Sequence, residues 1–183
     1  MGLIGCLSER KQGVVVMQLK SIKTLIKHGE SLVLEFKKST GELIGAMQAV
    51  CSFLNSYYGG TVLIGVTDDG KISGQEINDK TRREIATELN KFEPHADVAV
   101  EYVPVNEKLF VIVFFAKHGQ RAPYLYDGRA YVRSESTTRR MPQEEYEHLL
   151  QNRSPSTIAW DSLTTNDCNL NDLDKKRIRD VVK

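Results

Sequence analysis

The spacing of apolar residues alternates along the chain between the periods typical of helices and of strands. Residues 18–28 carry apolar side chains at helical spacing, and Gly29 follows as a residue that can end a helix. Residues 41–58 show a longer amphipathic pattern, and residues 78–91 show another. Pro142 favours the first turn of a further helix that reaches about Leu150.

Short β-prone runs bounded by turn residues predict strands at 31–36, 61–66, 98–105, 109–115, 124–126 and 129–133. The run 61–66 is almost entirely apolar, which predicts a strand buried on both faces. Asp127-Gly128 is a strong hairpin signal between the last two strands. We therefore expect an α/β (α+β) fold in which a mixed β-sheet with antiparallel hairpins is flanked by helices.

A chain of 183 residues is typical of one domain with a short appendage. We expect residues 1–16 to be a disordered leader and residues 17–153 to form the domain. The polar stretch after it predicts a linker and the start of a C-terminal helix within 154–183. The packing partner of that helix would lie beyond residue 183, as in a fragment of a longer protein.

Composition narrows the class of protein without naming a partner. Apolar residues make up 40% and charged residues 27%, and the net charge is +1, so a polyanion partner is neither required nor excluded. No apolar run is long enough to span a membrane. The widely separated cysteines Cys6, Cys51 and Cys168 argue against a zinc site and predict a reducing, cytoplasmic location.

A carboxylate and a lysine lie two residues apart at the end of the first predicted strand. Glu35 and Lys37 should therefore share one face, while Leu34 and Phe36 point to the core. Such a pair suits metal-assisted phosphodiester chemistry, because the carboxylate can hold a divalent ion while the ammonium orients water or offsets phosphate charge. The alternative is a solvated ion pair on a half-exposed strand.

Further carboxylates follow the buried strand 61–66. Ligands tend to bind beyond the carboxyl ends of sheet strands, so Asp68-Asp69 would complete a metal site with Glu30 and Glu35. The alternative is turn chemistry, since Asp-Asp-Gly is a turn signal. Converging carboxylates repel one another, so Glu35→Gln is expected to leave the metal-free protein as stable as before, or more stable.

Basic and aromatic residues alternate between residues 117 and 140, which points to phosphate contact and base stacking. The candidate nucleic-acid-binding residues are Lys117, Arg121, Arg129, Arg133, Arg139, Arg140, Tyr124 and Tyr131. The alternative is a solvated hairpin whose tyrosines lie in the core. Gly59-Gly60 is interpreted as the end of a helix entering a tight turn, because the sequence lacks a P-loop pattern.

Together these motifs resemble the Schlafen family, in particular its AlbA-type nucleic-acid-binding domain, from about Gly29 to Arg153. The order and spacing of the matching pieces carry the resemblance. They are Glu30-Ser31, Glu35-Phe36-Lys37, Phe53-Leu54-Asn55, Gly59 to Val66, Asp68-Asp69-Gly70, Pro123-Tyr124 and Tyr131-Val132-Arg133.

The resemblance implies an activity and partners. Animal Schlafens use three acidic residues in a metal-dependent endoribonuclease site, and the matching positions are Glu30, Glu35 and Asp68, with Lys37 beside them. The implied cofactor is Mg²⁺ or Mn²⁺. Microbial members often place this domain before an ATP-binding module and are labelled transcriptional regulators. The animal proteins pair two lobes, so this single lobe is expected to form a homodimer.

Three hypotheses follow for function. The first is a nucleic-acid-binding domain with a divalent-metal endoribonuclease site at Glu30, Glu35, Lys37 and Asp68. The second is a non-catalytic DNA-binding module of a transcriptional regulator. The third is a dimerising or regulatory domain that binds no nucleic acid.

Overall fold

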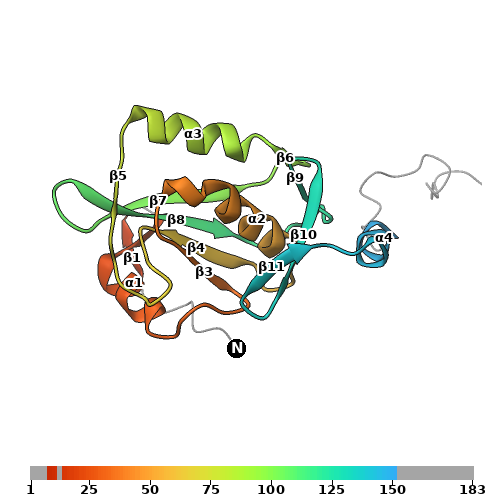
Figure 1. Cartoon of the computed structure of the whole chain (residues 1–183), viewed down its shortest axis with the longest axis horizontal. Coiled ribbons are helices and arrows are strands. Elements are labelled where there is room, and N and C mark those ends of the chain that lie inside the picture. Colours follow the sequence, from red (N-terminus) through yellow and green to blue (C-terminus); the bar gives the residue numbers. More distant parts are fainter. Residues whose placement is uncertain (1–7, 12–13, 152–183) are drawn as a thin grey trace, which may run out of the picture. The chain divides into compact units, whose positions relative to one another are not determined.

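The computed structural model describes residues 8–11 and 14–151, in which a long helix lies between two β-sheets (Figure 1). The larger sheet contains β3 (Leu34–Lys37), β4 (Gly60–Ile64), β5 (Gln75–Glu76), β7 (Val98–Pro104) and β8 (Leu109–Ala116). Strand β8 is central, since β7 pairs along one side of it while β4 and β5 share the other. Strand β3 forms an edge and runs parallel to β4, whereas the other pairings of this sheet are antiparallel, which confirms the expected mixed sheet.

The second sheet is antiparallel and contains β6 (Phe92–Glu93), β9 (Leu125–Tyr126), β10 (Arg129–Ser134) and β11 (Thr137–Arg140) in the order β11-β10-β9-β6. Asp127 and Gly128 join β9 to β10 with φ angles of 50° and 72°. Two consecutive positive φ angles are the requirement of a two-residue hairpin turn, so the predicted Asp-Gly hairpin is confirmed.

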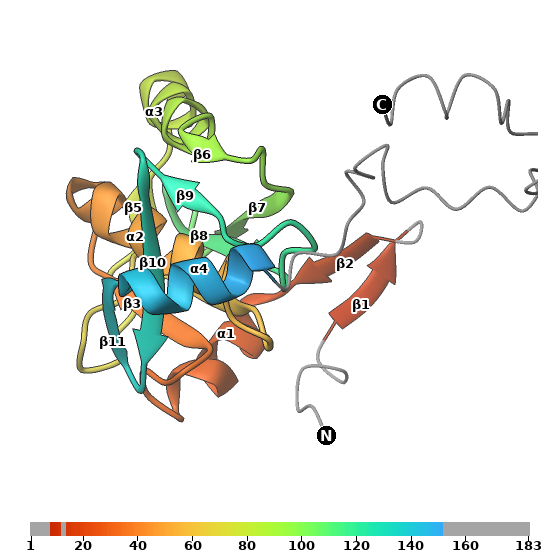
Figure 2. The same cartoon turned by 90° about the vertical axis from the view of Figure 1, so that its right-hand side faces the viewer.

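The helices are α1 (Leu19–Ile26), α2 (Leu43–Leu54), α3 (Asp79–Leu89) and α4 (Gln143–Gln151), with a short 3₁₀ turn η2 (Thr40–Glu42) before α2. They correspond to four of the five predicted helices, but α2 is shorter than 41–58 because the chain leaves the helix at Asn55. Figure 2 shows α4 in front of β10. Within the described residues, none of these helices is long and apolar enough to cross a membrane.

The larger sheet separates two apolar cores. Val62 and Ile64 of β4 face α2 and the second sheet, whereas Leu63 between them packs with Ile22 of α1 and with Phe36. All of these side chains are fully buried. Alternating burial on both faces is what the unbroken apolar run 61–66 predicts.

Part of the expected leader is a hairpin. Strand β1 (Ser8–Lys11) pairs with β2 (Val14–Met17), where the sequence pattern predicts disorder. The backbone N–H of Met17 donates to Glu101 Oε2 on β7 at 2.7 Å, which ties the end of β2 to the larger sheet. The linker and C-terminal helix predicted within 154–183 lie outside the described residues.

The turn between α2 and β4 allows a test of whether its backbone requires glycine. Gly59 has φ +67°, and a Cβ placed on it would lie 2.4 Å from the carbonyl oxygen of Ala116. Gly29 has a similar φ of +69° but no atom within 4 Å of such a Cβ. We expect Gly59→Ala to lower the free energy of unfolding by at least about 1 kcal/mol more than Gly29→Ala does, because only Gly59→Ala adds a backbone clash to the φ strain. Urea denaturation measures both, and equal losses would contradict the close approach.

Candidate active site and nucleic-acid surface

Strand β3 carries the predicted acidic residue on the side that faces α2. Glu35 is only 7% exposed and forms an ion pair with Lys37, which agrees with the predicted shared face. Lys37 extends over the start of α2, since its Cε lies 3.5 Å from a Cβ placed on Gly45. Leu34 and Phe36 point to the α1 core as expected. Glu35 is therefore buried and Lys37 half-buried, unlike the solvated surface pair of the alternative interpretation.

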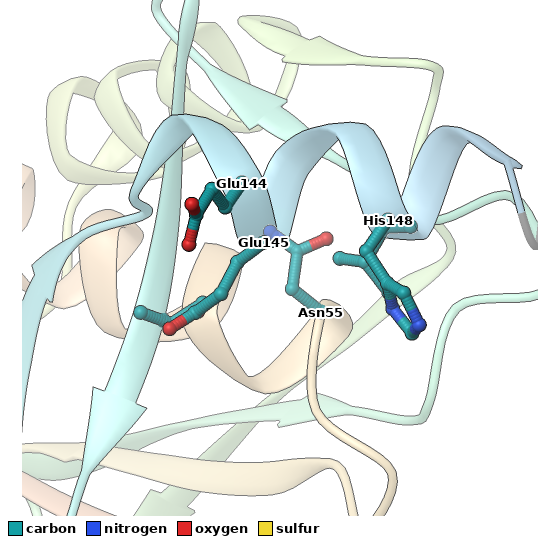
Figure 3. Close-up of a pocket in the computed structure, with 6 residues that line it drawn as sticks. Asn55, Glu144, Glu145 and His148 are labelled. Carbon is teal, nitrogen blue, oxygen red and sulfur yellow. The ribbon is translucent and has the colours of Figure 1, made fainter.

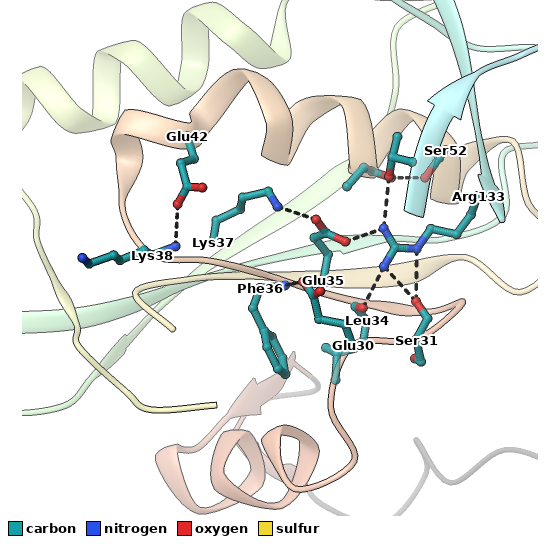
Figure 4. A network of polar contacts seen from close by, with 12 residues as sticks. Glu30, Ser31, Leu34, Glu35, Phe36, Lys37, Lys38, Glu42, Ser52 and Arg133 are labelled. Atoms are coloured by element: carbon teal, nitrogen blue, oxygen red, sulfur yellow. Dashed lines mark hydrogen bonds and ion pairs between the residues drawn. The ribbon is translucent and has the colours of Figure 1, made fainter. Parts of the chain in front are cut away.

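A second cation reaches Glu35 from the other sheet. The guanidinium of Arg133 on β10 forms an ion pair with Glu35 Oε2, and its side chain is 2% exposed (Figure 4). Its remaining donors bond to Thr138 Oγ1 at 3.0 Å, to the Ser31 carbonyl at 2.9 and 3.1 Å, and to the Leu34 carbonyl at 3.1 Å. These contacts occupy all five N–H groups of the guanidinium. The predicted phosphate contact by Arg133 is therefore wrong for this conformation, because the side chain has no donor left.

The other two predicted acidic residues, Glu30 and Asp68, differ in what they contact. Glu30 follows α1, and its Oε1 accepts a hydrogen bond from the backbone N–H of Phe36 at 2.9 Å, which covers the open edge of β3. Asp68 is exposed in the turn after β4 and makes no hydrogen bond or ion pair within the described residues. Its neighbour Asp69 is held by Thr67 and Lys71, and these hydrogen bonds hold the pKa of Asp69 below its ordinary value.

The three carboxylates do not form a metal-binding group in this conformation. Among the residues that the structure describes, no three Asp, Glu, His or Cys side chains are placed to hold one ion. Both oxygens of Glu35 already accept from cations, and Glu30 is committed to a backbone N–H. The side chains present therefore do not fit Mg²⁺ or Mn²⁺ as they stand.

This arrangement reverses the expected sign of one substitution. The sequence interpretation assumes that Glu35 is repelled by neighbouring carboxylates, but its ion-pair partners are Lys37 and Arg133. Removing the charge of Glu35 leaves two cations close together and one of them buried, which is costly. Glu35→Gln is therefore expected to destabilise the protein instead of stabilising it.

The predicted stacking tyrosines belong to the core. Tyr124 and Tyr131 are 6% and 7% exposed and pack in the cluster around α2. The Asn55 side chain at the end of α2 fixes both strands, since it donates to the carbonyls of Tyr124 and Tyr131 at 3.0 Å and accepts from Tyr124 N at 2.7 Å. The proposal that these two rings stack on bases is therefore corrected, because their faces are covered by protein.

The remaining predicted cations divide into one paired and four free side chains. Arg139 donates to Glu145 on α4 at 2.9 Å. The other four are exposed and make no ion pair within the described residues, and they are Lys117, Arg121, Arg129 and Arg140. Exposed, unpaired cations are the groups that can neutralise phosphates.

A pocket of about 420 Å³ lies between α4 and β10 (Figure 3). Asn55, Val132, Glu144, Glu145, His148 and Leu149 line it. Two glutamates at its wall make the pocket unfavourable for a phosphate backbone, since like charges repel. The four free cations are therefore the better candidates for contact with nucleic acid.

Among the residues that the structure describes, the exposed tyrosines lie outside the predicted stretch. Tyr57 and Tyr58 are 81% and 74% exposed in the loop between α2 and β4. Two adjacent tyrosines before a glycine pair were the signal in the sequence, because glycines mark the loop in which such rings cannot be buried easily.

A family model described as Schlafen, AlbA_2 matches residues 30–142, which is more than half of the chain. The chain belongs to the Schlafen AlbA_2 family. The match begins at Glu30 and ends at Pro142, so it includes β3 through β11 and leaves out α1 and α4. The acidic strand, the Gly59-Gly60 turn and the Arg133 strand thus all lie within the Schlafen AlbA_2 region.

Solved structures with low sequence identity share parts of this Schlafen-type chain. One is the DIP2311 protein from Corynebacterium diphtheriae, with 16% identity and a TM-score of 0.48 over 79% of this chain and 26% of that protein. Another is the N-terminal domain of a RecG-related protein from Nitrosomonas europaea, with 21% identity and a TM-score of 0.46 over 66% of this chain and 91% of that domain. The chain thus spans about a quarter of the Corynebacterium protein. No curated protein matches the present chain.

Replacing Arg133 tests whether the polar network of this Schlafen-type domain is structural. We expect Arg133→Ala to lower the free energy of unfolding by about 3–5 kcal/mol, because it removes one partner of a buried ion pair. Arg129→Ala on the same strand removes an exposed arginine and is expected to change stability by less than about 0.5 kcal/mol. Urea denaturation measures both variants, and equal midpoints would show that the network does not hold the sheets together.

Proposed function

We propose that this domain binds nucleic acid through the exposed cations of the β8–β9 loop and the second sheet. Membership of the Schlafen AlbA_2 family supports a nucleic-acid-related role. The observation that carries the proposal is that Lys117, Arg121, Arg129 and Arg140 remain exposed and unpaired among the described residues, in a stretch otherwise used for packing. Phosphate contacts of this kind give affinity that does not depend on sequence.

Binding without cleavage fits the geometry better than an endoribonuclease. A hydrolytic site needs carboxylates that are free to hold an ion, whereas both oxygens of Glu35 are taken by Lys37 and Arg133. This favours the hypothesis of a non-catalytic DNA-binding module, as in a transcriptional regulator, over the nuclease hypothesis. Homodimer formation and a C-terminal ATP-binding module stay predictions from the Schlafen resemblance.

The salt dependence of binding tests the proposed contacts. Each phosphate contact contributes roughly 0.9 to the log–log slope for duplex DNA and roughly 0.7 for a single strand. We expect Arg129→Ala/Arg140→Ala to weaken binding to every sequence and to lower the slope by roughly 1.4–1.8 in total. Fluorescence anisotropy with labelled oligonucleotides at several salt concentrations measures this.

Lys108→Ala is the matched control for lost charge. Lys108 is exposed at the tip of the β7–β8 hairpin, and β8 separates it from Lys117 by about 30 Å at roughly 3.3 Å per residue. The control variant should bind with the slope of the wild type. If Lys108→Ala lowers the salt slope as much as the double variant does, the phosphate contacts lie elsewhere.

A cleavage assay separates the two hypotheses about chemistry. We expect labelled transfer RNA and single- and double-stranded DNA to stay intact with the wild-type protein, both with millimolar Mn²⁺ and with chelator, because Glu35 is held by two cations. Shortening that requires Mn²⁺ and is lost in Glu35→Gln would contradict this and establish the nuclease. The Glu35→Gln protein is first checked for folding by its melting temperature.

A further inference from the structure

The loop that carries the two exposed tyrosines is tightly held. Ser56 Oγ donates to the Phe53 carbonyl at 3.0 Å and accepts from the backbone N–H of Gly59 at 3.1 Å. His118 Nδ1 donates to the Ser56 carbonyl at 2.8 Å, which joins this loop to the residues after β8. Tyr57 and Tyr58 are therefore presented to solvent by a fixed backbone.

The rings form a small aromatic group. The centroids of Tyr57 and Tyr58 lie 5.4 Å apart with perpendicular planes, and the centroids of Tyr57 and His118 lie 6.0 Å apart with planes inclined at 44°. Rings that are perpendicular or inclined leave ring faces open, whereas stacked rings would cover each other. With 81% and 74% of the two tyrosines exposed, large ring surfaces remain available to a ligand.

Cations and a cavity lie next to these rings. Lys117 and Arg121 line a cavity of about 340 Å³ together with His118 and Asp97. Lys117 and Arg121 can each neutralise a phosphate, and the Asp97 carboxylate can accept from the exocyclic amino group of a base. Exposed ring faces, two cations and a carboxylate acceptor thus occur within one short stretch of surface.

We propose that Tyr57, Tyr58 and His118 form a stacking platform for the bases of a single-stranded nucleic acid, with Lys117 and Arg121 holding its phosphates. This inference rests on the proposed function and adds the preferred class of ligand and a site outside the second sheet. A duplex hides its base faces in its own stack, so exposed ring faces select unpaired bases. The cations beside the rings match a polyanion, and this favours nucleic acid over an apolar protein partner.

The test compares single-stranded and duplex binding in aromatic variants of the full chain. We expect Tyr57→Ala/Tyr58→Ala to weaken binding of a 20-nucleotide single strand, as DNA and as RNA, by at least roughly tenfold, because each stacked base contributes measurably to affinity. Its duplex affinity and its salt slope should stay those of the wild type. Tyr57→Phe/Tyr58→Phe keeps the rings and should bind within about threefold of the wild type. Lys117→Ala should instead lower the single-strand slope by about 0.7.

The outcomes separate the platform from the wider proposal. Single-strand affinity that survives Tyr57→Ala/Tyr58→Ala in a protein that binds nucleic acid overturns the platform alone, and a protein-docking role for the rings would give this result. Equal losses for single strand and duplex overturn the preference for unpaired bases. A wild-type protein that binds no oligonucleotide at low salt overturns the proposed function, and the platform with it. Melting temperatures verify that each variant is folded.

Discussion

The guanidinium of Arg133 joins the second sheet to the edge of the first and determines how Glu35 is used. Its five N–H groups donate to Glu35, to Thr138 Oγ1 and to the carbonyls of Ser31 and Leu34. Withdrawing such a pair from water is costly, so its contribution to net stability is no larger than that of a well-packed apolar contact. Five bonds from one planar group restrict how β10 can lie against β3, and we infer that the network fixes the position of the second sheet relative to the first.

The same interaction decides what Glu35 can do chemically. A carboxylate that bonds to a guanidinium and an ammonium presents little uncompensated negative charge to a divalent ion. Glu30 covers a backbone N–H at the strand edge, so a second acidic residue of the motif is also used for structure. Of the three predicted acidic residues, only Asp68 makes no hydrogen bond or ion pair within the part of the chain that the structure describes. Two of the three predicted acidic residues, Glu30 and Glu35, are therefore engaged in contacts that hold the fold together.

Local patterns predicted the elements well, and tertiary contacts decided the roles of the side chains. Helical periodicity, the apolar run of β4 and the Asp127-Gly128 turn depend on neighbouring residues, so they could be recognised in the sequence. The burial of Tyr131 depends on α2, which lies some eighty positions earlier in the chain. The hydrogen bonds that occupy the Arg133 guanidinium likewise depend on distant residues, those of the β3 segment. A basic and aromatic composition could not distinguish side chains that pack from side chains that bind.

Because of this distinction, the candidate nucleic-acid surface differs from the one that the sequence predicts. Of the predicted stretch, the four exposed and unpaired cations stay available to a polyanion, and the exposed rings come from the α2–β4 loop instead. That loop and the residues after β8 are held side by side because Gly60 pairs with Ala116 in the larger sheet. Close approach of the two segments requires a residue without a Cβ at position 59, since a Cβ there would meet the Ala116 carbonyl. The Gly59-Gly60 turn thus acts through packing, because it lets the loop that carries Tyr57 approach the segment that carries His118.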